Sequence, residues 1–247
     1  MGGRTAWYVF GVTPGGPAVP AGVDPTPLAA GVERLAVGEM QAVVSRVPLD
    51  ELLGDGPQDP AWVLPRIEAH DRVLTAVAAA GAVVPFRFGV VYGSREAVAE
   101  ALDGRVDALL AALRRVGNGQ EWTLSIGTGT GTSPAGRRPP PGSGAERAAA
   151  SGQGRSYLLA RGAELGARQR LDDTVSALRR RCEVWNIPAM ALPPGADGAC
   201  RLACLIPRRA AGEIVSRLTA PTAIDPGLGV SVRGPLPPYH FVGRNPT

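Results

Sequence analysis

The sequence contains no lysine, because all 26 of its basic residues are arginine, and these stand against 22 acidic residues. The net charge of +4 is modest for 247 residues, and acidic residues are interspersed among the arginines. A nucleic-acid-binding protein more often gathers its basic residues on one face and offers aromatic side chains that stack on bases. Aromatic residues make up only 5% of this chain. The composition therefore argues against nucleic-acid binding.

Cysteines and long hydrophobic runs are also scarce. The three cysteines, Cys182, Cys200 and Cys204, are too few for a disulfide framework. No apolar run reaches the roughly 20 residues that a membrane-spanning helix needs. The segment Met1–Val12 lacks the apolar core and cleavage site of a signal peptide. These absences predict a soluble cytoplasmic protein that does not enter a membrane.

Glycine and proline, by contrast, are abundant, with 33 and 24 residues respectively, and they are clustered. Residues 127–154 hold the densest cluster and almost no side chain that a core would bury, as in a flexible linker. We therefore expect two compact domains, at 1–126 and 155–233, separated by this linker. We expect residues 234–247 to form a proline-rich C-terminal tail.

The first expected domain contains five strand-like and two helix-like segments. Asp59 and Ser94 are suited to cap the two helices, which carry apolar residues at spacings of three and four. The expected strands are 6–12, 32–37, 40–47, 83–92 and 121–126, and the expected helices are 60–81 and 94–116. This order predicts an α+β sandwich of the ferredoxin-like type, with an added strand and both helices on one face of a mostly antiparallel sheet.

The second expected domain is a smaller unit of the same style. Its expected helices are 157–181 and 208–218, and its expected strands are 184–192, 199–206 and 228–233. The fold class predicted for the whole chain is therefore α+β, with two ferredoxin-like α/β sandwiches.

The segment Val83–Tyr92 is the most apolar short run of the first half of the chain. Its period of two predicts a strand with Phe86 and Phe88 on one face and Pro85 and Arg87 on the other. Proline donates no backbone hydrogen bond, so we expect this strand at the edge of the sheet. The guanidinium of Arg87 then requires a carboxylate partner or access to solvent.

No group of residues in the sequence forms a convincing catalytic, cofactor-binding or metal-binding site. His70 lies on the apolar stripe of its expected helix, which favours a buried structural histidine over a general base. Cys200 and Cys204 lie four residues apart on an expected strand, about 13 Å from each other, so they cannot form a disulfide together. The glycine runs at 127–132 and 152–154 lack the strand–loop–helix context of a phosphate site. We therefore expect a protein that is not an enzyme and holds no cofactor.

Five motifs occur in order and together span nearly the whole chain. They are Tyr8-Val-Phe-Gly-Val12, His70 with Val84-Pro-Phe-Arg-Phe-Gly-Val-Val-Tyr92, Leu113 with Glu121-Trp122, Gly154-Arg-Ser-Tyr-Leu158, and Gly234-Pro-Leu-Pro-Pro-Tyr-His-Phe-Val242. These motifs resemble those of the GvpL/GvpF family of gas vesicle proteins. One departure from the family pattern is that the closing motif usually carries tryptophan and serine where this chain has Leu236 and His240.

This resemblance implies a minor, non-enzymatic component of gas vesicles that contacts the small shell-forming protein GvpA and helps to nucleate or organise vesicle formation. It also implies other gas vesicle accessory proteins as partners, and two ferredoxin-like domains with a C-terminal tail. The apolar edge-like strand then becomes a candidate surface for the shell protein, because exposed strand edges accept added strands. The residues predicted to bind a partner are Pro85, Phe86, Arg87 and Tyr92. The residues predicted to dock the tail are Leu236, Tyr239 and Phe241.

Two alternatives of other classes stay open at this point. The first is an RNA-binding module, since ferredoxin-like sheets can present aromatic side chains to bases, although the glycine-and-aromatic signature of such modules is reduced to a loose echo in Phe86-Arg-Phe-Gly89. The second is a small-molecule enzyme built around His70 and Arg87.

Overall fold

The computed structural model describes residues 4–15, 20, 22–53, 56–128, 150–195 and 197–243. The chain forms two compact units, each built from separate segments. Unit 1 consists of Met1–Trp122, Leu205–Arg209 and Gly234–Thr247, and unit 2 consists of Thr123–Cys204 and Ala210–Arg233. The predicted linker at 127–154 lies largely outside the described residues.

The fold is mixed α/β with two antiparallel sheets. The strands are β1 (Thr5–Pro14), β2 (Glu33–Val37), β3 (Met40–Pro48), β4 (Val84–Pro85), β5 (Val91–Tyr92), β6 (Gly119–Thr128), β7 (Ala189–Leu192), β8 (Cys200–Pro207) and β9 (Leu228–Leu236). The α-helices are α1 (Leu49–Leu53), α2 (Pro60–Ala80), α3 (Arg95–Asp103), α4 (Val106–Val116), α5 (Ala150–Val184) and α6 (Ala211–Leu218), with short 3-10 turns η1 (Gly56–Gln58) and η2 (Arg208–Ala210).

The first sheet has the strand order β2-β3-β1-β4, and β5 also pairs with β1. The hairpin of β2 and β3 turns at Gly38, whose φ of 54° is accessible to glycine at little cost. Asp59 and Ser94 cap α2 and α3 through their side chains, as the sequence predicted.

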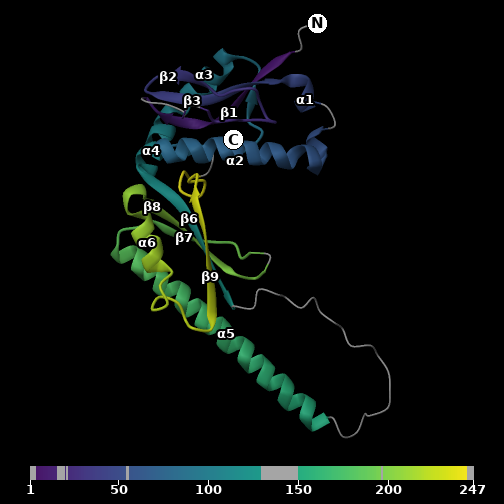
Figure 1. Cartoon of the computed structure of the whole chain (residues 1–247), viewed down its shortest axis with the longest axis vertical. Helices are drawn as coiled ribbons and strands as arrows, with labels where there is room; N and C mark the ends of the chain where they lie inside the picture. Colours follow the sequence, from purple (N-terminus) through teal and green to yellow (C-terminus); the bar gives the residue numbers. More distant parts are fainter. Residues whose placement is uncertain are drawn as a thin grey trace, which may run out of the picture. The chain divides into compact units, whose positions relative to one another are not determined.

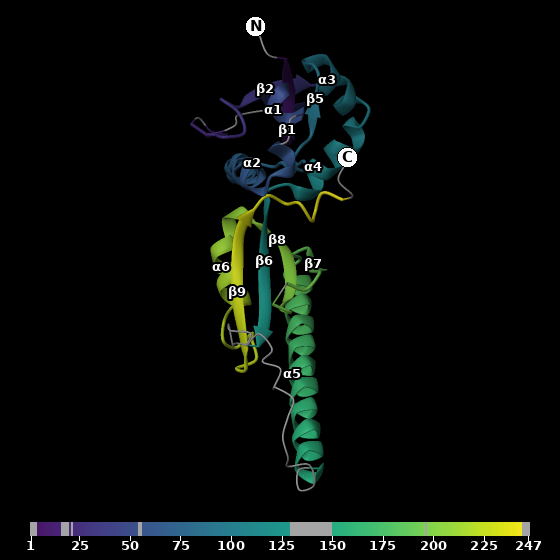
Figure 2. The same cartoon turned by 90° about the vertical axis from the view of Figure 1, so that its right-hand side faces the viewer.

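Helices cover both faces of this first sheet, and the prediction that they share one face is wrong. Figures 1 and 2 show α2 on one side and α3 on the other. Alternate residues of β1 supply the two cores, since Val9 and Val12 pack with α3 and α4, whereas Tyr8 and Phe10 pack with α2. The physical reason is visible in the sequence of β1, which is apolar at nearly every position and is therefore buried on both faces.

The predicted strand 83–92 is two short strands, β4 and β5, both paired with β1. Gly89 lies between them with a φ of +92°, a conformation in which an extended strand cannot continue. The predicted helix 94–116 is also divided, into α3 and α4, because the chain leaves helical geometry at Arg105 after the cap residue Gly104.

The second sheet has the strand order β7-β8-β6-β9. It includes β6, which the sequence assigned to the first sheet. That assignment is wrong, since the free side of β1 is already occupied by β4 and β5. The predicted strand at 184–192 shrinks to β7, because α5 continues to Val184 and Asn186 then takes a positive φ of 53°. Both α5 and α6 belong to unit 2.

Candidate tail-docking site around His70

His70 lies on the buried face of α2 and is only 1% exposed. Its ring stacks on Phe10, with the ring centroids 5.6 Å apart and the planes inclined by 23°. Tyr8 and Phe88 meet the same ring edge-on. The first strand, the second helix and the loop before Gly89 therefore enclose this histidine on several sides.

A directional chain of hydrogen bonds passes through the His70 ring. The Gly89 backbone N–H donates to the Tyr8 hydroxyl at 3.1 Å, and that hydroxyl lies 2.8 Å from His70 Nδ1. Because Tyr8 has accepted one bond and has a proton to give, the arrangement assigns Nδ1 as an acceptor and places the ring proton on Nε2. Nε2–H then faces two oxygens, the Tyr239 hydroxyl at 3.1 Å and the Phe86 carbonyl at 3.2 Å.

Tyr239 brings the C-terminal tail (the described residues 234–243 of unit 1) into this chain of bonds. Its hydroxyl accepts from His70 and donates to the Asp71 carboxylate at 3.1 Å. We call Tyr8, His70, Asp71 and Tyr239 the His70 cluster. Every polar group in the cluster has a partner, as buried polar groups require. The arrangement joins three segments that are distant in the sequence, at Tyr8, Phe86 and Tyr239, to one ring.

Burial keeps the cluster neutral apart from the Asp71 carboxylate. Burial lowers the pKa of His70 to about 4. Burial also raises the pKa of both Tyr8 and Tyr239, and for Tyr239 the nearby Asp71 carboxylate adds to the rise. An imidazole with this pKa is uncharged near neutral pH, and its two nitrogens are committed to structural partners. The geometry is therefore suited to holding the tail, and it positions no nucleophile.

A second anchor lies one residue further along the tail. The Glu121 carboxylate is buried, at 1% exposure of the residue, and accepts from the His240 backbone N–H at 3.0 Å. Its other oxygen lies 2.6 Å from His240 Nδ1. A buried carboxylate without such partners would be strongly unfavourable, so this residue depends on the tail being in place.

Apolar contacts complete the attachment of the tail. Phe241 and Val242 are buried, and Val242 belongs to the core cluster under α3 and α4. Leu236, the last residue of β9, is half-buried. At Gly234 a Cβ atom would lie 2.6 Å from the indole ring of Trp122, so a residue with a side chain cannot fit there without displacement. In Figure 2 the tail, in yellow, passes α2 and α4.

The predicted partner-binding residues differ in accessibility, and of the four it is Phe86 whose carbonyl contacts His70. Pro85 and Phe86 are buried, Arg87 is exposed, and Tyr92 is partly buried against the core. Arg87 and Tyr92 are thus the members of the set that a partner could touch directly. The contact itself stays a prediction.

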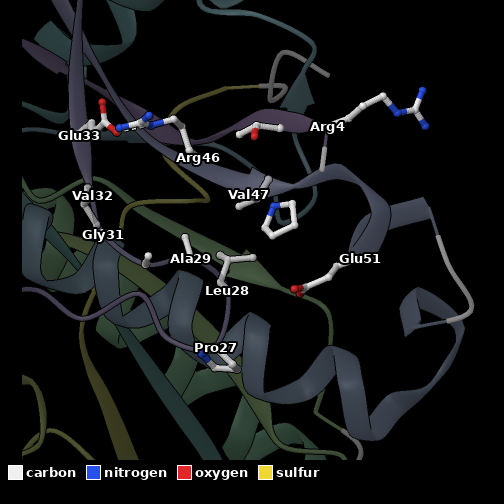
Figure 3. A pocket seen from close by; sticks show the side chains of 13 residues that line it. Arg4, Pro27, Leu28, Ala29, Gly31, Val32, Glu33, Arg46, Val47 and Glu51 are labelled. Atoms are coloured by element: carbon white, nitrogen blue, oxygen red, sulfur yellow. Dashed lines mark hydrogen bonds and ion pairs between the residues drawn. The ribbon is translucent and has the colours of Figure 1, made fainter. Parts of the chain in front are cut away.

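A separate hollow of about 780 Å³ opens in unit 1 beside β1, β3 and α1. Figure 3 shows the Glu51 carboxylate directed toward Leu28 across this hollow, whereas the Arg4 side chain points away from it. Three of its charged groups are already engaged, Arg46 and Glu33 with each other at 2.8 Å and Glu51 with Arg66 at 3.3 Å. The polar groups therefore do not converge on a common point, as they would around a small-molecule ligand.

Neither a metal-binding cluster nor a membrane span occurs in the part of the chain that the structure describes. No three histidine, cysteine, aspartate or glutamate residues among these come close enough to share an ion. Of the described helices, none combines the length and apolarity needed to cross a bilayer.

The family of this protein follows from a match to a known protein family. The family described as gas vesicle synthesis protein GvpL/GvpF matches residues 6–243. The chain belongs to the GvpL/GvpF family. This confirms the family resemblance drawn from the sequence motifs.

Curated relatives and solved structures agree with this membership. The chain is 27% identical to gas vesicle protein L of Streptomyces sp. (strain CB03234) over 219 residues, which is 83% of this chain and 81% of that protein. It is also 27% identical to gas vesicle protein F of the same strain, over 78% of this chain and 84% of that protein.

Two crystal structures share the fold, each with a TM-score of 0.65. They are GvpF from Anabaena sp. PCC7120, at 16% identity, covering 96% of both chains, and GvpF from Microcystis aeruginosa, at 18% identity, covering 96% of this chain and 98% of that one.

The family motifs noted in the sequence meet at the tail-docking site. Tyr8, His70, Phe86, Glu121 and Tyr239 come from four of the five motifs, and all lie in or against it. Sequence reasoning named these residues but did not anticipate their mutual contacts, and it treated His240 only as a departure from the family pattern.

Proposed function

We propose that this protein is a minor, non-enzymatic component of gas vesicle formation that binds the small shell-forming protein GvpA and helps to nucleate or organise the vesicle wall. The family match over residues 6–243 is the observation that carries this proposal. Partners among other gas vesicle accessory proteins, and a location at the cytoplasmic gas vesicle, belong to the same proposal. We also propose that both units are of the ferredoxin-like type.

The surface proposed for the shell protein is the exposed neighbourhood of Arg87 and Tyr92. Arg87 follows the buried pair Pro85 and Phe86, which hold the backbone against β1 through Gly11 and Phe10. Because the backbone is fixed in this way, binding a carboxylate on a partner costs only the conformational freedom of the Arg87 side chain, whose planar guanidinium can bind that carboxylate through two hydrogen bonds. We expect Arg87 to supply the charged contact and Tyr92 part of the apolar contact.

The function itself is tested by deleting the gene and examining the cells for vesicles by electron microscopy. We expect vesicles to be absent or malformed, and the intact gene supplied in trans should restore them. Normal vesicles in the deletion strain would contradict a role in their formation.

The proposed surface is tested by co-purifying the shell protein with Arg87→Ala, using Arg114→Ala as the matched control. Arg114 is an exposed arginine of unit 1 on α4, so its removal changes the net charge equally. Removing an arginine from the contact should weaken binding of the shell protein roughly five- to thirtyfold, as for a contact worth about 1–2 kcal/mol. Arg114→Ala should bind as the wild type does. Equal binding by both variants, with unchanged thermal melting, would exclude this surface.

A further inference from the structure

Two of the three cysteines come together in unit 2. The sulfur atoms of Cys182 on α5 and Cys204 on β8 lie 3.8 Å apart, and both residues are fully buried. Neither is in a disulfide. The contact was hidden in the sequence, where 22 residues separate them.

The positions of both cysteines are fixed by regular secondary structure, the helix α5 for Cys182 and the strand β8 for Cys204. On α5 the buried residues Thr174, Leu178 and Cys182 recur every fourth position and form the face that packs on the sheet. On β8 the side chains of Leu202, Cys204 and Ile206 lie on the same face of the strand, because every second residue of a strand points to the same side. Figures 1 and 2 show the C-terminal part of α5 beside β7 and β8.

The third cysteine is separated from this pair by the geometry of the strand. Cys200 lies four residues before Cys204, about 13 Å along β8, and it is partly exposed. Cys182 touches Cys204, so it is too far from Cys200 for an S–S bond. The three thiols therefore allow one intramolecular pairing.

We propose that Cys182 and Cys204 are an oxidation site, at which a small two-electron oxidant of the peroxide class converts the two thiols into a disulfide that fixes α5 to β8. The sulfurs must close from 3.8 Å to the ~2.05 Å of a disulfide, which side-chain rotation with a small backbone adjustment can supply. The hydrogen bond from Cys204 also lowers the pKa of the Cys182 thiol, which assists the attack.

The reaction balances with one equivalent of hydrogen peroxide. The Cys182 thiolate attacks one peroxide oxygen, the O–O bond breaks, and the products are a sulfenic acid and hydroxide, which takes a proton to become water. The Cys204 sulfur then attacks the sulfenic sulfur, its proton joins the departing hydroxyl group, and a second water leaves. Two thiols are oxidised by two electrons, and one peroxide is reduced to two waters.

Burial makes the pair selective for small oxidants. A bulky thiol reagent should modify Cys200 in the folded protein and leave Cys182 and Cys204 untouched. Hydrogen peroxide is about as small as a solvent molecule, so it should reach Cys182 and Cys204 when the fold opens locally.

The test treats the folded full-length protein with hydrogen peroxide at low excess, blocks the remaining thiols under denaturing conditions, and maps the peptides without reduction. We expect a Cys182–Cys204 cross-linked peptide in wild type and in Cys200→Ala, and none in Cys182→Ala or Cys204→Ala. The oxidised wild type should also melt at a higher temperature than the reduced protein, and dithiothreitol should reverse the shift.

Mapping the wild type needs no substitution, so a variant that fails to fold does not affect the result. The proposal is overturned if Cys182 and Cys204 stay reduced while Cys200 oxidises. It is equally overturned if they link only after denaturant has unfolded the protein, or if they convert to sulfinic acid without linking.

Discussion

The two units are stabilised in different ways. Unit 1 places apolar cores on both faces of its sheet and also buries polar groups, notably His70 and Glu121. Unit 2 buries few polar groups among its described residues, and its long helix α5 exposes Leu159 and Leu165 at 66% and 56%. Figures 1 and 2 show the N-terminal part of this helix extending past the strands of unit 2. Unit 1 therefore depends on polar groups being correctly paired, whereas unit 2 carries surface that its own fold does not use.

The largest expected effect comes from removing the tail, by ending the chain at Leu236. This deletes Tyr239, Phe241 and Val242 and leaves the Glu121 carboxylate without His240. Loss of the two buried apolar side chains and of the carboxylate's partner should destabilise unit 1 by roughly 4–6 kcal/mol. Hydrogen exchange measured by mass spectrometry should show faster exchange in α2 and unchanged exchange in β7 and α6. Equal acceleration in both units would contradict the distinction between them.

The second effect is a loss of stability of unit 1 in acid. The folded-state pKa of His70, about 4, lies below its ordinary value of about 6.5. As the pH falls through this window the unfolded chain takes up a proton that the folded chain refuses, so stability is present above about pH 6.5 and declines toward pH 4. The loss attributable to His70 is about 3 kcal/mol when the pH has fallen below both pKa values.

This acid effect is measured by urea unfolding at pH 7 and pH 4.5. His70→Gln should be less stable than wild type at pH 7 but should show a smaller further loss at pH 4.5. An identical pH slope in the wild type and in the variant would show that His70 is not the group responsible.

Some features of the fold could be predicted from the sequence alone, and others could not. The hairpin, the caps at Asp59 and Ser94 and the buried stripe through His70 follow from local patterns, and each agrees with the structure. The sheet that β6 joins could not be derived locally, because it depends on strands that come some 80 and 110 residues later. The Glu121–His240 contact spans 119 residues and was hidden for the same reason. The two-faced burial of β1 was readable, since its apolar residues are nearly continuous.

A smaller effect is expected for Gly234→Ala, which disturbs the entry of the tail without removing any anchor. The new methyl group would lie 2.6 Å from the Trp122 ring, and the φ of +157° is unfavourable for alanine. We expect a loss of about 1–3 kcal/mol in unit 1, measured by thermal or urea unfolding. Gly93→Ala is the control, because its added methyl would meet open space. Indistinguishable stabilities would show that the tail can shift without loss.

The smallest effect is expected in unit 2, for Leu165→Gln on the exposed part of α5. The side chain is 56% exposed, so stability should change by less than about 0.5 kcal/mol. Leu178→Gln on the same helix is the matched contrast, since that leucine is fully buried and the substitution should unfold its surroundings. Circular dichroism melting of the two variants compares them directly. A large loss from Leu165→Gln would show that this surface is covered within the fold.

The pairing of the tail with the His70 cluster is tested most directly by nitrogen NMR of the His70 ring across a pH titration. In the full chain the ring should stay neutral, with its proton on Nε2, down to about pH 4. In the chain ending at Leu236 the ring should titrate closer to the ordinary value of about 6.5. A His70 ring that titrates near 6.5 in the full chain, or that is unaffected by loss of the tail, would contradict the tail-docking site described here.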